Sequence, residues 1–459
     1  MNSDFSNGKV WKIIIYQSVP LIFAQLVQLL YNVVDRIYIG HMEGVGDLAL
    51  TGVGLAFPVT TLIAAFTSLF GSGGAPLFSI ARGAKDEQQA SKILSHVFML
   101  LTLSSIVLFI ISFVFKTEIL YAFGAGDNSI QYASDYLEIY LFGTTFSMVA
   151  TGLNNFINAQ GFPKIGMFTI CIGAVLNMIL DPLFIYVFDM GVKGAAIATV
   201  ISQCASFVWV LYFFTKGMSL YHISFRDMLP DFTLIAKICT LGLAGFFMMA
   251  TNCAVQITCN KMLKIYGDLE FAGGSDLYIG VMTIINSIRE ILSLPASGIG
   301  GGAQPVLSYN FGARKYSRVK AAIKFASVAG FIYMLAAWLV VEIFPHAVMS
   351  VFTNSNTMIN DGTPALHSYF FGFFFMAFMF SGQSTFTALG CAKRAVFFSL
   401  LRKAIIVIPL TVFLPSVFGV MGVFMAEPIS NAIGGISSFI TMILTVYKKF
   451  PSDDEEAKI

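Results

Sequence analysis

The chain has few charged residues for its length, and this shortage excludes most soluble folds. Only 11% of its 459 residues are charged, whereas 57% are hydrophobic. A soluble domain carries roughly 25% charged residues, so a water-soluble fold does not account for this composition. The sequence therefore predicts an integral membrane protein with many spans.

The chain also lacks the short motifs on which many enzymes and pumps depend. It contains no HExxH, GxSxG or Walker A pattern, its six cysteines form no CxxC pair, and its five histidines lie far apart. These absences argue against structural zinc, acyl transfer and ATP-driven transport by this chain alone. We expect that the chain is not an enzyme and that it binds no cofactor other than a coupling ion. A membrane-embedded enzyme is kept as the alternative from a different class.

Long apolar runs make up most of the chain. A spanning helix needs about 20 apolar residues, and twelve segments qualify: 13–39, 49–81, 93–115, 131–153, 165–188, 194–215, 234–262, 277–309, 321–345, 363–389, 395–418 and 421–447. Basic residues gather in alternate loops, for example around Lys85, Lys216 and Arg314. Because basic loops stay inside, we expect both termini in the cytoplasm. Since no organelle-targeting segment is seen, we expect a bacterial plasma membrane.

The two halves of the chain repeat each other. The segment from Gly71 to Lys85 resembles the one from Gly300 to Arg314, 229 positions later, and the glycine pair of Gly191-Val-Lys-Gly194 recurs 228 positions later. Matching motifs fall in inside loops in both halves, which predicts parallel repeats. We expect an all-α fold of two six-helix lobes related by a pseudo-two-fold axis along the membrane normal. The expected parts are an N-lobe (1–215), a cytoplasmic linker (216–232), a C-lobe (233–450) and an acidic tail (451–459).

Asp181 is the strongest candidate for a functional residue. It lies in an apolar run from Ile165 to Phe188, where a carboxylate costs roughly 2.5–3.5 kcal/mol even on lenient insertion scales. Asn177 precedes it by four residues and shares its helical face. Pro182 follows and frees backbone carbonyls one turn back, as in the broken helices of transporters. These features indicate an ion site within the membrane.

Other polar residues inside the apolar runs are open to two interpretations. Asp35 either faces the same cavity or pairs with Arg36 near the outer interface. Thr199 either contributes an oxygen ligand or bonds only to its own helix backbone. Asn154 lies near the end of a predicted helix, where it could simply act as a cap.

In their order and spacing these motifs resemble the multidrug and toxic compound extrusion (MATE) family. The motifs that carry the resemblance are Ser18-Val-Pro20, Tyr31-Asn-Val-Val-Asp35, Leu176 to Pro182, Gly191 to Thr199, and Gln304 to Ala313. The resemblance implies export of small amphipathic, often cationic organic compounds in exchange for protons or sodium ions. It also implies alternating access between two lobes. We expect a lipid bilayer and small molecules as partners, no nucleic acid, and a monomer.

The resemblance also implies roles for individual residues. In members of the DinF-like type the coupling ion, H⁺ or Na⁺, binds in the N-lobe, and the matching residues here are Asp35, Asn177, Asp181 and Thr199. Asn154 and Tyr136 (or Tyr140) resemble residues of the neighbouring network. Pro20 would act as a hinge in the first helix. The acids of the NorM type in the seventh and tenth helices are missing. Glu290 and Glu427 remain as C-lobe acids that could contact a cationic substrate, as in members resembling MepA.

A lipid-linked-oligosaccharide flippase of the same superfamily is the alternative function. It would share the scaffold but would need a more cationic cavity for a pyrophosphate. The sequence has few arginines and lysines inside its apolar runs, namely Arg36, Arg289, Arg402 and Lys403. This scarcity favours the drug exporter.

Overall fold

The computed structural model describes residues 4–42, 45–126, 129–271, 273–353 and 355–451. Within these ranges the chain is helical and contains no β-strand. A helix satisfies all of its backbone hydrogen bonds within one segment, which a chain in lipid requires. The all-α prediction is therefore confirmed, whereas the predicted acidic tail lies outside the described residues apart from Pro451.

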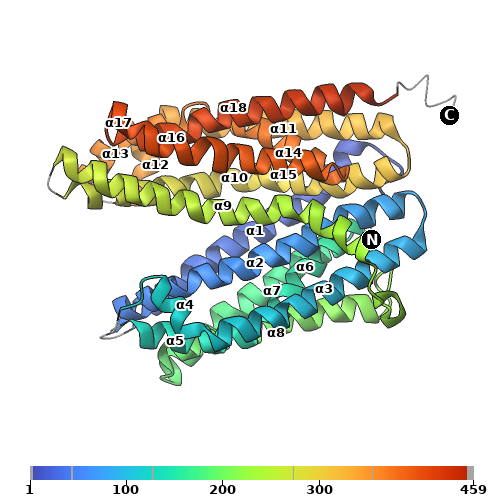
Figure 1. Ribbon diagram of the computed structural model, residues 1–459, viewed down its shortest axis with the longest axis horizontal. Coiled ribbons are helices and arrows are strands. Elements are labelled where there is room, and N and C mark those ends of the chain that lie inside the picture. The colour runs from blue at the N-terminus through green and yellow to red at the C-terminus, as the bar shows by residue number, and fades with distance from the viewer. Residues whose placement is uncertain (1–3, 43–44, 127–128, 272, 354, 452–459) are drawn as a thin grey trace. The chain divides into compact units, whose positions relative to one another are not determined.

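The helices follow one another with short connections (Figure 1). In the first half they are α1 (Val10–Gly40), α2 (Gly46–Gly83), α3 (Glu87–Val114), α4 (Lys116–Ala122), α5 (Ile130–Phe142), α6 (Thr144–Ala159), α7 (Pro163–Pro182), η1 (Leu183–Val187), α8 (Gly191–Thr215) and η2 (Phe225–Met228). In the second half they are α9 (Phe232–Glu270), α10 (Gly274–Gly312), α11 (Tyr316–Ile343), α12 (Pro345–Ser350), α13 (Asn356–Phe370), η3 (Phe373–Phe375), α14 (Met376–Ala388), α15 (Ala392–Leu400), η4 (Leu401–Val407), α16 (Ile408–Phe413), α17 (Pro415–Phe418), α18 (Met421–Thr445) and η5 (Tyr447–Lys449).

Eleven segments of the described chain are long and apolar enough to cross a membrane. The expected span at 131–153 is not among these eleven, because Gly143 divides it into α5 and α6, each too short to qualify alone. A Cβ atom at Gly143 would lie 2.2 Å from Oε1 of Gln203, so the α8 side chain occupies the place that a larger residue would need. Counted together, α5 and α6 supply the twelfth span.

The sequence repeat is also a repeat of backbone conformation. Lys85 and Arg314, 229 positions apart, both adopt positive φ angles (61° and 58°), which non-glycine residues seldom do. Gly161 and Gly390, at the same spacing, have φ angles of 90° and 69°. The short helices α4 and α12 follow the third span of each half. The two halves therefore follow the same path through their turns.

The described chain divides into two compact units that do not end at the linker. One unit contains the residues up to Phe5 together with Val19–Phe246, and the other contains Ser6–Ser18 and the residues from Phe247 onward. The division therefore falls within α1 and within α9, which differs from the boundaries expected at residues 216–232.

The linker lies in the first unit because polar contacts attach it to α3 and to the residue that follows α6. Lys92 Nζ lies 2.8 Å from Asp231 Oδ2, and the Ser224 amide donates to Ser95 Oγ at 3.0 Å. The Leu220 amide donates to Gln160 Oε1 at 2.7 Å. The segment 216–232 is thus an integral part of the first unit.

Each unit has its own apolar core. Phe78, Phe156 and Phe213 lie in the core of the first unit, and Phe370 and Phe424 lie in that of the second. All five side chains are less than 2% exposed. The rings of Phe78 and Phe156 have centroids 5.2 Å apart and join α2 to α6, which matters because close packing rather than water exclusion holds helices together in lipid.

Candidate functional site

Four of the predicted ion-site residues come from three helices of the first unit. Asp35 lies on α1, Asn177 and Asp181 lie on α7, and Thr199 lies on α8. Their exposed fractions are 8%, 1%, 0% and 3% respectively. The three helices thus bring polar side chains into an otherwise apolar interior, which is typical of a functional site in a membrane protein.

The backbone around Asp181 is irregular. Asp181 is followed by Pro182, which ends α7, and then by the π-helix η1. Proline has no N–H group to donate, and π-helical turns occur frequently at functional sites. The local sequence therefore weakens the helix at the residue that carries the buried acid.

The neutral members of the site are linked by hydrogen bonds. Asn177 Nδ2 donates to Thr199 Oγ1 at 3.2 Å, and Thr199 Oγ1 donates to the Ala195 carbonyl at 3.0 Å. In this orientation the Asn177 amide nitrogen donates a hydrogen bond, whereas its oxygen Oδ1 has no partner among the described residues. Asn177 Oδ1 is therefore available to a donor or a cation.

Three carboxyl oxygens of the two acids lack a donor among the described residues. Both carboxyl oxygens of Asp181 and Oδ1 of Asp35 are buried and lack a hydrogen-bond partner among the described residues. The two carboxyl groups lie close enough to interact with each other. Because an ionised carboxylate only accepts hydrogen bonds, the pair can bond directly only when it holds a proton.

Two tyrosines, Tyr31 and Tyr136, lie close to the acids, and Tyr31 was missed as a site residue from the sequence. Tyr136 and Tyr140 are stacked, with ring centroids 5.8 Å apart, and Tyr140 lies beside the amide of Gln203. Tyr31 lies near Asp35, Asp181 and Thr199. Its spacing of four residues from Asp35 on α1 is the signal that could have identified it.

Asn154 does not join this group. It is 7% exposed on α6, and a Cβ atom at Gly166 would lie 3.1 Å from its Oδ1. Gly166 precedes Asn177 by eleven residues on α7, a distance of about 16 Å along a helix. Asn154 also lies within α6, five residues before its end, so it is not a cap.

Pro20 lies inside α1, which continues as one helix from Val10 to Gly40. It is the second residue after Ser18, where the chain passes from one compact unit to the other. Because proline removes one backbone hydrogen bond from a helix, α1 is weakest at this point. Its role as a hinge stays a prediction.

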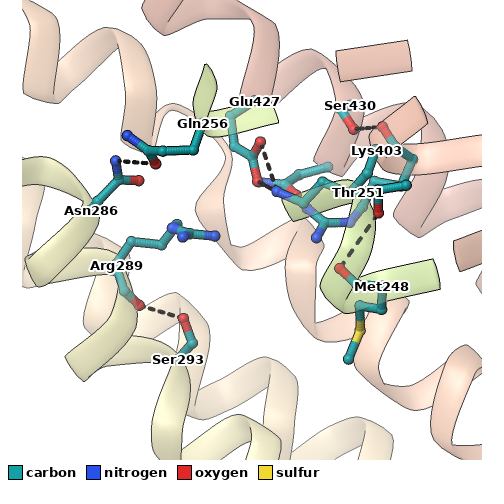
Figure 2. A network of polar contacts seen from close by, with 11 residues as sticks. Met248, Thr251, Gln256, Asn286, Arg289, Ser293, Lys403, Glu427 and Ser430 are labelled. Carbon is teal, nitrogen blue, oxygen red and sulfur yellow. Dashed lines mark hydrogen bonds and ion pairs between the residues drawn. The ribbon is translucent and has the colours of Figure 1, made fainter. Parts of the chain in front are cut away.

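The two predicted acids of the second half have different surroundings. Glu290 on α10 is exposed, whereas Glu427 on α18 is 4% exposed. Glu427 Oε1 accepts hydrogen bonds from Arg402 Nη1 at 2.9 Å and Lys403 Nζ at 3.0 Å (Figure 2). The charge of Glu427 is therefore compensated by two cations, and a contact with a cationic substrate stays a prediction.

The oxygens gathered around Asp181 are suited to a proton or a small hard cation. Two carboxylates, one amide oxygen and one hydroxyl are hard ligands of the kind that sodium prefers. In the part of the chain that the structure describes, no group of three or more His, Cys, Asp or Glu side chains could hold a metal ion. Any cation here would therefore depend on the neutral oxygens of Asn177 and Thr199 as well as on the two acids.

Comparison with known proteins gives matches along most of the chain. The family model MatE matches residues 20–183 and 246–413. The multidrug export protein MepA of Staphylococcus aureus (strain N315) is 24% identical over 442 residues, which cover 96% of this chain and 95% of MepA. MepA of Staphylococcus haemolyticus (strain JCSC1435) is 23% identical over 442 residues, 96% of this chain and 94% of that protein.

Solved structures show the same fold. A crystal structure of MATE in the bent conformation has a TM-score of 0.89 at 22% identity and covers 98% of each chain. A MOP superfamily transporter from Pyrococcus furiosus, described with reverse polarity of its binding pocket, has a TM-score of 0.88 at 23% identity and covers 97% of this chain and 98% of its own.

Proposed function

Because this chain belongs to the MatE family, which consists of transporters rather than enzymes, we propose that it is a secondary active multidrug exporter. The relatives named multidrug export protein support outward transport of organic compounds. The bacterial relatives and the membrane-spanning helices support a multi-pass protein of a bacterial plasma membrane. The exported compounds are amphipathic, and they are exchanged for H⁺ or Na⁺.

The observation that carries the coupling is the buried carboxyl pair. Asp35 and Asp181 share one site in the first unit, and neither Asp181 oxygen accepts a hydrogen bond from a described residue. A single carboxylate inside a bilayer already costs roughly 2.5–3.5 kcal/mol, and two adjacent ones also repel each other. One proton or one sodium ion would relieve both effects. The pair is therefore the proposed binding site of the coupling ion.

The neighbouring residues would complete this site. Asn177 Oδ1 has no partner among the described residues, and Thr199 Oγ1 has a lone pair beyond its contacts with Asn177 and Ala195. With an ion bound, α1 and α7 can approach at Asp35 and Asp181, and without it the two acids drive them apart. Bending of α1 at Pro20 would carry this change along the helix, reduce the cavity and release the compound outward.

The test is ethidium efflux from cells or everted vesicles that contain the wild type or Asp181→Asn. A pH gradient and a sodium gradient are imposed separately, so that the gradient that drives efflux identifies the ion. We expect gradient-driven efflux by the wild type and none by the variant, because asparagine keeps the shape of the side chain but cannot be ionised. Normal efflux by Asp181→Asn would contradict the proposed coupling site.

Asp189→Asn provides the matched control. Asp189 is exposed in the turn between η1 and α8, and its φ angle of 53° is one that asparagine adopts readily. This variant loses the same charge eight residues away from Asp181 without touching the carboxyl pair. Its efflux should equal that of the wild type, which separates loss of the site from loss of folding or expression.

A further inference from the structure

The second unit contains a polar cluster in which positive charge exceeds negative charge. Its members are Arg289 on α10, Arg402 and Lys403 on η4, and Glu427 on α18. Arg402, Lys403 and Glu427 are 5%, 3% and 4% exposed. Glu290 follows Arg289 in sequence but is exposed, and even with it included the cations outnumber the carboxylates.

Two of the cations have a structural role. Lys403 Nζ contacts both oxygens of Glu427, at 3.0 and 3.2 Å, and Arg402 Nη1 donates to Glu427 Oε1 and to Asn431 Oδ1. Consecutive residues of an α-helix face different directions, and the π-helical turn of η4 explains how both can be buried against α18. These ion pairs attach η4 to α18, and two cations already contact the single buried carboxylate.

Arg289 is the cation that this structure does not use. Its side chain makes no hydrogen bond or ion pair with a described residue, and its Nε atom is buried without a partner. Figure 2 shows it extending from α10 toward the group around Glu427, beside the Gln256–Asn286 pair. Because a guanidinium offers five donors in a planar fork, it is suited to bind a carboxylate or phosphate with two hydrogen bonds.

Polar side chains on α9 connect this cluster with exposed surface. Asn252, Gln256 and Asn260 recur every four residues of α9 and are all exposed. Gln256 accepts a hydrogen bond from Asn286 Nδ2 at 3.3 Å, one turn of α10 before Arg289. Polar side chains within a membrane span usually face a water-filled cavity or protein rather than lipid. This face of α9 therefore indicates a polar approach to Arg289.

We propose that Arg289, supported by the charges of Arg402 and Lys403, binds an anionic group of the transported compound. The ligand would be a carboxylate, sulfonate or phosphate on an amphipathic anion or zwitterion. This subsite rests on the export function proposed above and narrows its substrate class. Compounds with only positive charge would gain no affinity from it. The same chemistry fits a lipid phosphate, which the test must distinguish from a small organic anion.

The experiment uses two rhodamine dyes that differ in one group, a free carboxylate in one and its methyl ester in the other. Binding of each dye to the purified full-length protein in detergent is measured by fluorescence polarisation for the wild type, Arg289→Gln and Arg289→Lys. We expect Arg289→Gln to weaken binding of the carboxylate dye about tenfold or more, as loss of a charge-assisted contact does. The ester should bind equally to all three, and Arg289→Lys should restore part of the difference.

Arg226→Gln is the matched control because it removes an exposed arginine from the linker. Equal loss of both dyes in Arg289→Gln, or no preference for the carboxylate in the wild type, would overturn the subsite. Binding needs no gradient, so this result stands even where efflux fails and the export function is wrong.

A third arm tests the lipid source. Anionic and zwitterionic phospholipids are added as competitors of the carboxylate dye, and flipping of a labelled phospholipid is followed in proteoliposomes. We expect weak competition and no flipping that depends on Arg289. Strong competition together with flipping lost in Arg289→Gln would overturn the small-molecule assignment in favour of a lipid headgroup.

Discussion

At the scale of single residues, the buried acids differ in whether the protein compensates their charge. Asp181 is fully buried and none of its oxygens accepts a hydrogen bond from a described residue, whereas Glu427 has three such contacts from two cations. A buried ion pair mainly fixes structure, and an unpaired buried acid needs an external partner. The contacts thus distinguish a structural acid from one that is proposed to bind an ion.

Glu427→Gln should therefore act on stability. Without the carboxylate, Arg402 and Lys403 would remain buried with uncompensated charge, which typically costs about 3–5 kcal/mol. We expect a clear fall in the melting temperature of the purified protein in detergent. Glu290→Gln is the control, since an exposed side chain that forms no ion pair with a described residue should change stability by at most about 0.5 kcal/mol. Equal melting temperatures for the two variants would contradict the structural role of Glu427.

Asp231 gives a prediction about pH. Its Oδ2 accepts a hydrogen bond from Lys92, and its Oδ1 accepts the amides of Thr233 and Leu234 at the start of α9. The hydrogen bond from Lys92 is the main cause that lowers the pKa of Asp231 to about 2. An unfolded aspartate titrates near about 3.9. The stabilisation is therefore complete above about pH 4 and is lost as the pH falls through about 2.

Hydrogen exchange at the Thr233 and Leu234 amides measures this effect. Protection, corrected for the intrinsic exchange rate, should fall between about pH 4 and pH 2 in the wild type. Asp231→Asn should lose that dependence, and Asp227→Asn in the same linker should keep it. A wild-type profile that is flat over this range would show that the Lys92 contact does not hold the linker.

At the scale of elements, most spans could be predicted from the sequence but not all of their interruptions. Long apolar runs identified the spans, because a membrane requires both length and hydrophobicity. The division at Gly143 was missed because it depends on Gln203, a residue sixty positions later. The interruption at η1 follows Pro182, which the sequence did indicate, whereas η4 was missed because no proline or glycine lies within Leu401–Val407 and the segment packs against α18.

The repeated glycines have a measurable role in joining neighbouring spans. A Cβ atom at Gly194 would lie 2.7 Å from the Phe184 backbone, and one at Gly422 would lie 2.4 Å from the Leu414 backbone. Backbone atoms cannot move aside cheaply, so Gly194→Ala and Gly422→Ala should each cost about 1–3 kcal/mol. The measurement is thermal unfolding in detergent.

Gly54→Ala on α2 is the control for these two variants, because nothing lies within 4 Å of its Cβ position. Alanine there should be neutral or stabilise the helix by about 0.5–1 kcal/mol. If all three variants melted at the same temperature, the close approaches would not be needed for stability.

At the scale of the whole molecule, the separation of residues along the chain explains which contacts of the sites could be predicted. Asp181 and Asn177 are four residues apart on one helix, so sequence alone indicated their shared face. Arg289 and Glu427 lie 138 positions apart, and only the packing of the second unit shows that they belong to one cluster. Local spacing therefore linked Asn177 with Asp181, whereas Asp35 and Thr199 were placed beside them only through the family resemblance, and the cationic cluster required the fold.

The orientation of both halves in the membrane is a further prediction from the paired basic turns. Lys85 and Arg314 occupy equivalent turns with the same left-handed backbone, so both turns should lie on the same side. Because basic loops stay inside, that side is proposed to be the cytoplasm. Single cysteines would be placed at the exposed positions Gln88, Arg226 and Lys193 after replacement of the six native cysteines.

A membrane-impermeant maleimide should label Lys193→Cys in intact cells. It should label Gln88→Cys and Arg226→Cys only in everted vesicles, because both positions lie on the cytoplasmic side of the membrane in the proposed topology. Since consecutive spans alternate in direction, the opposite pattern would place both termini outside. It would also reverse the direction of transport that is proposed for the Asp35–Asp181 site.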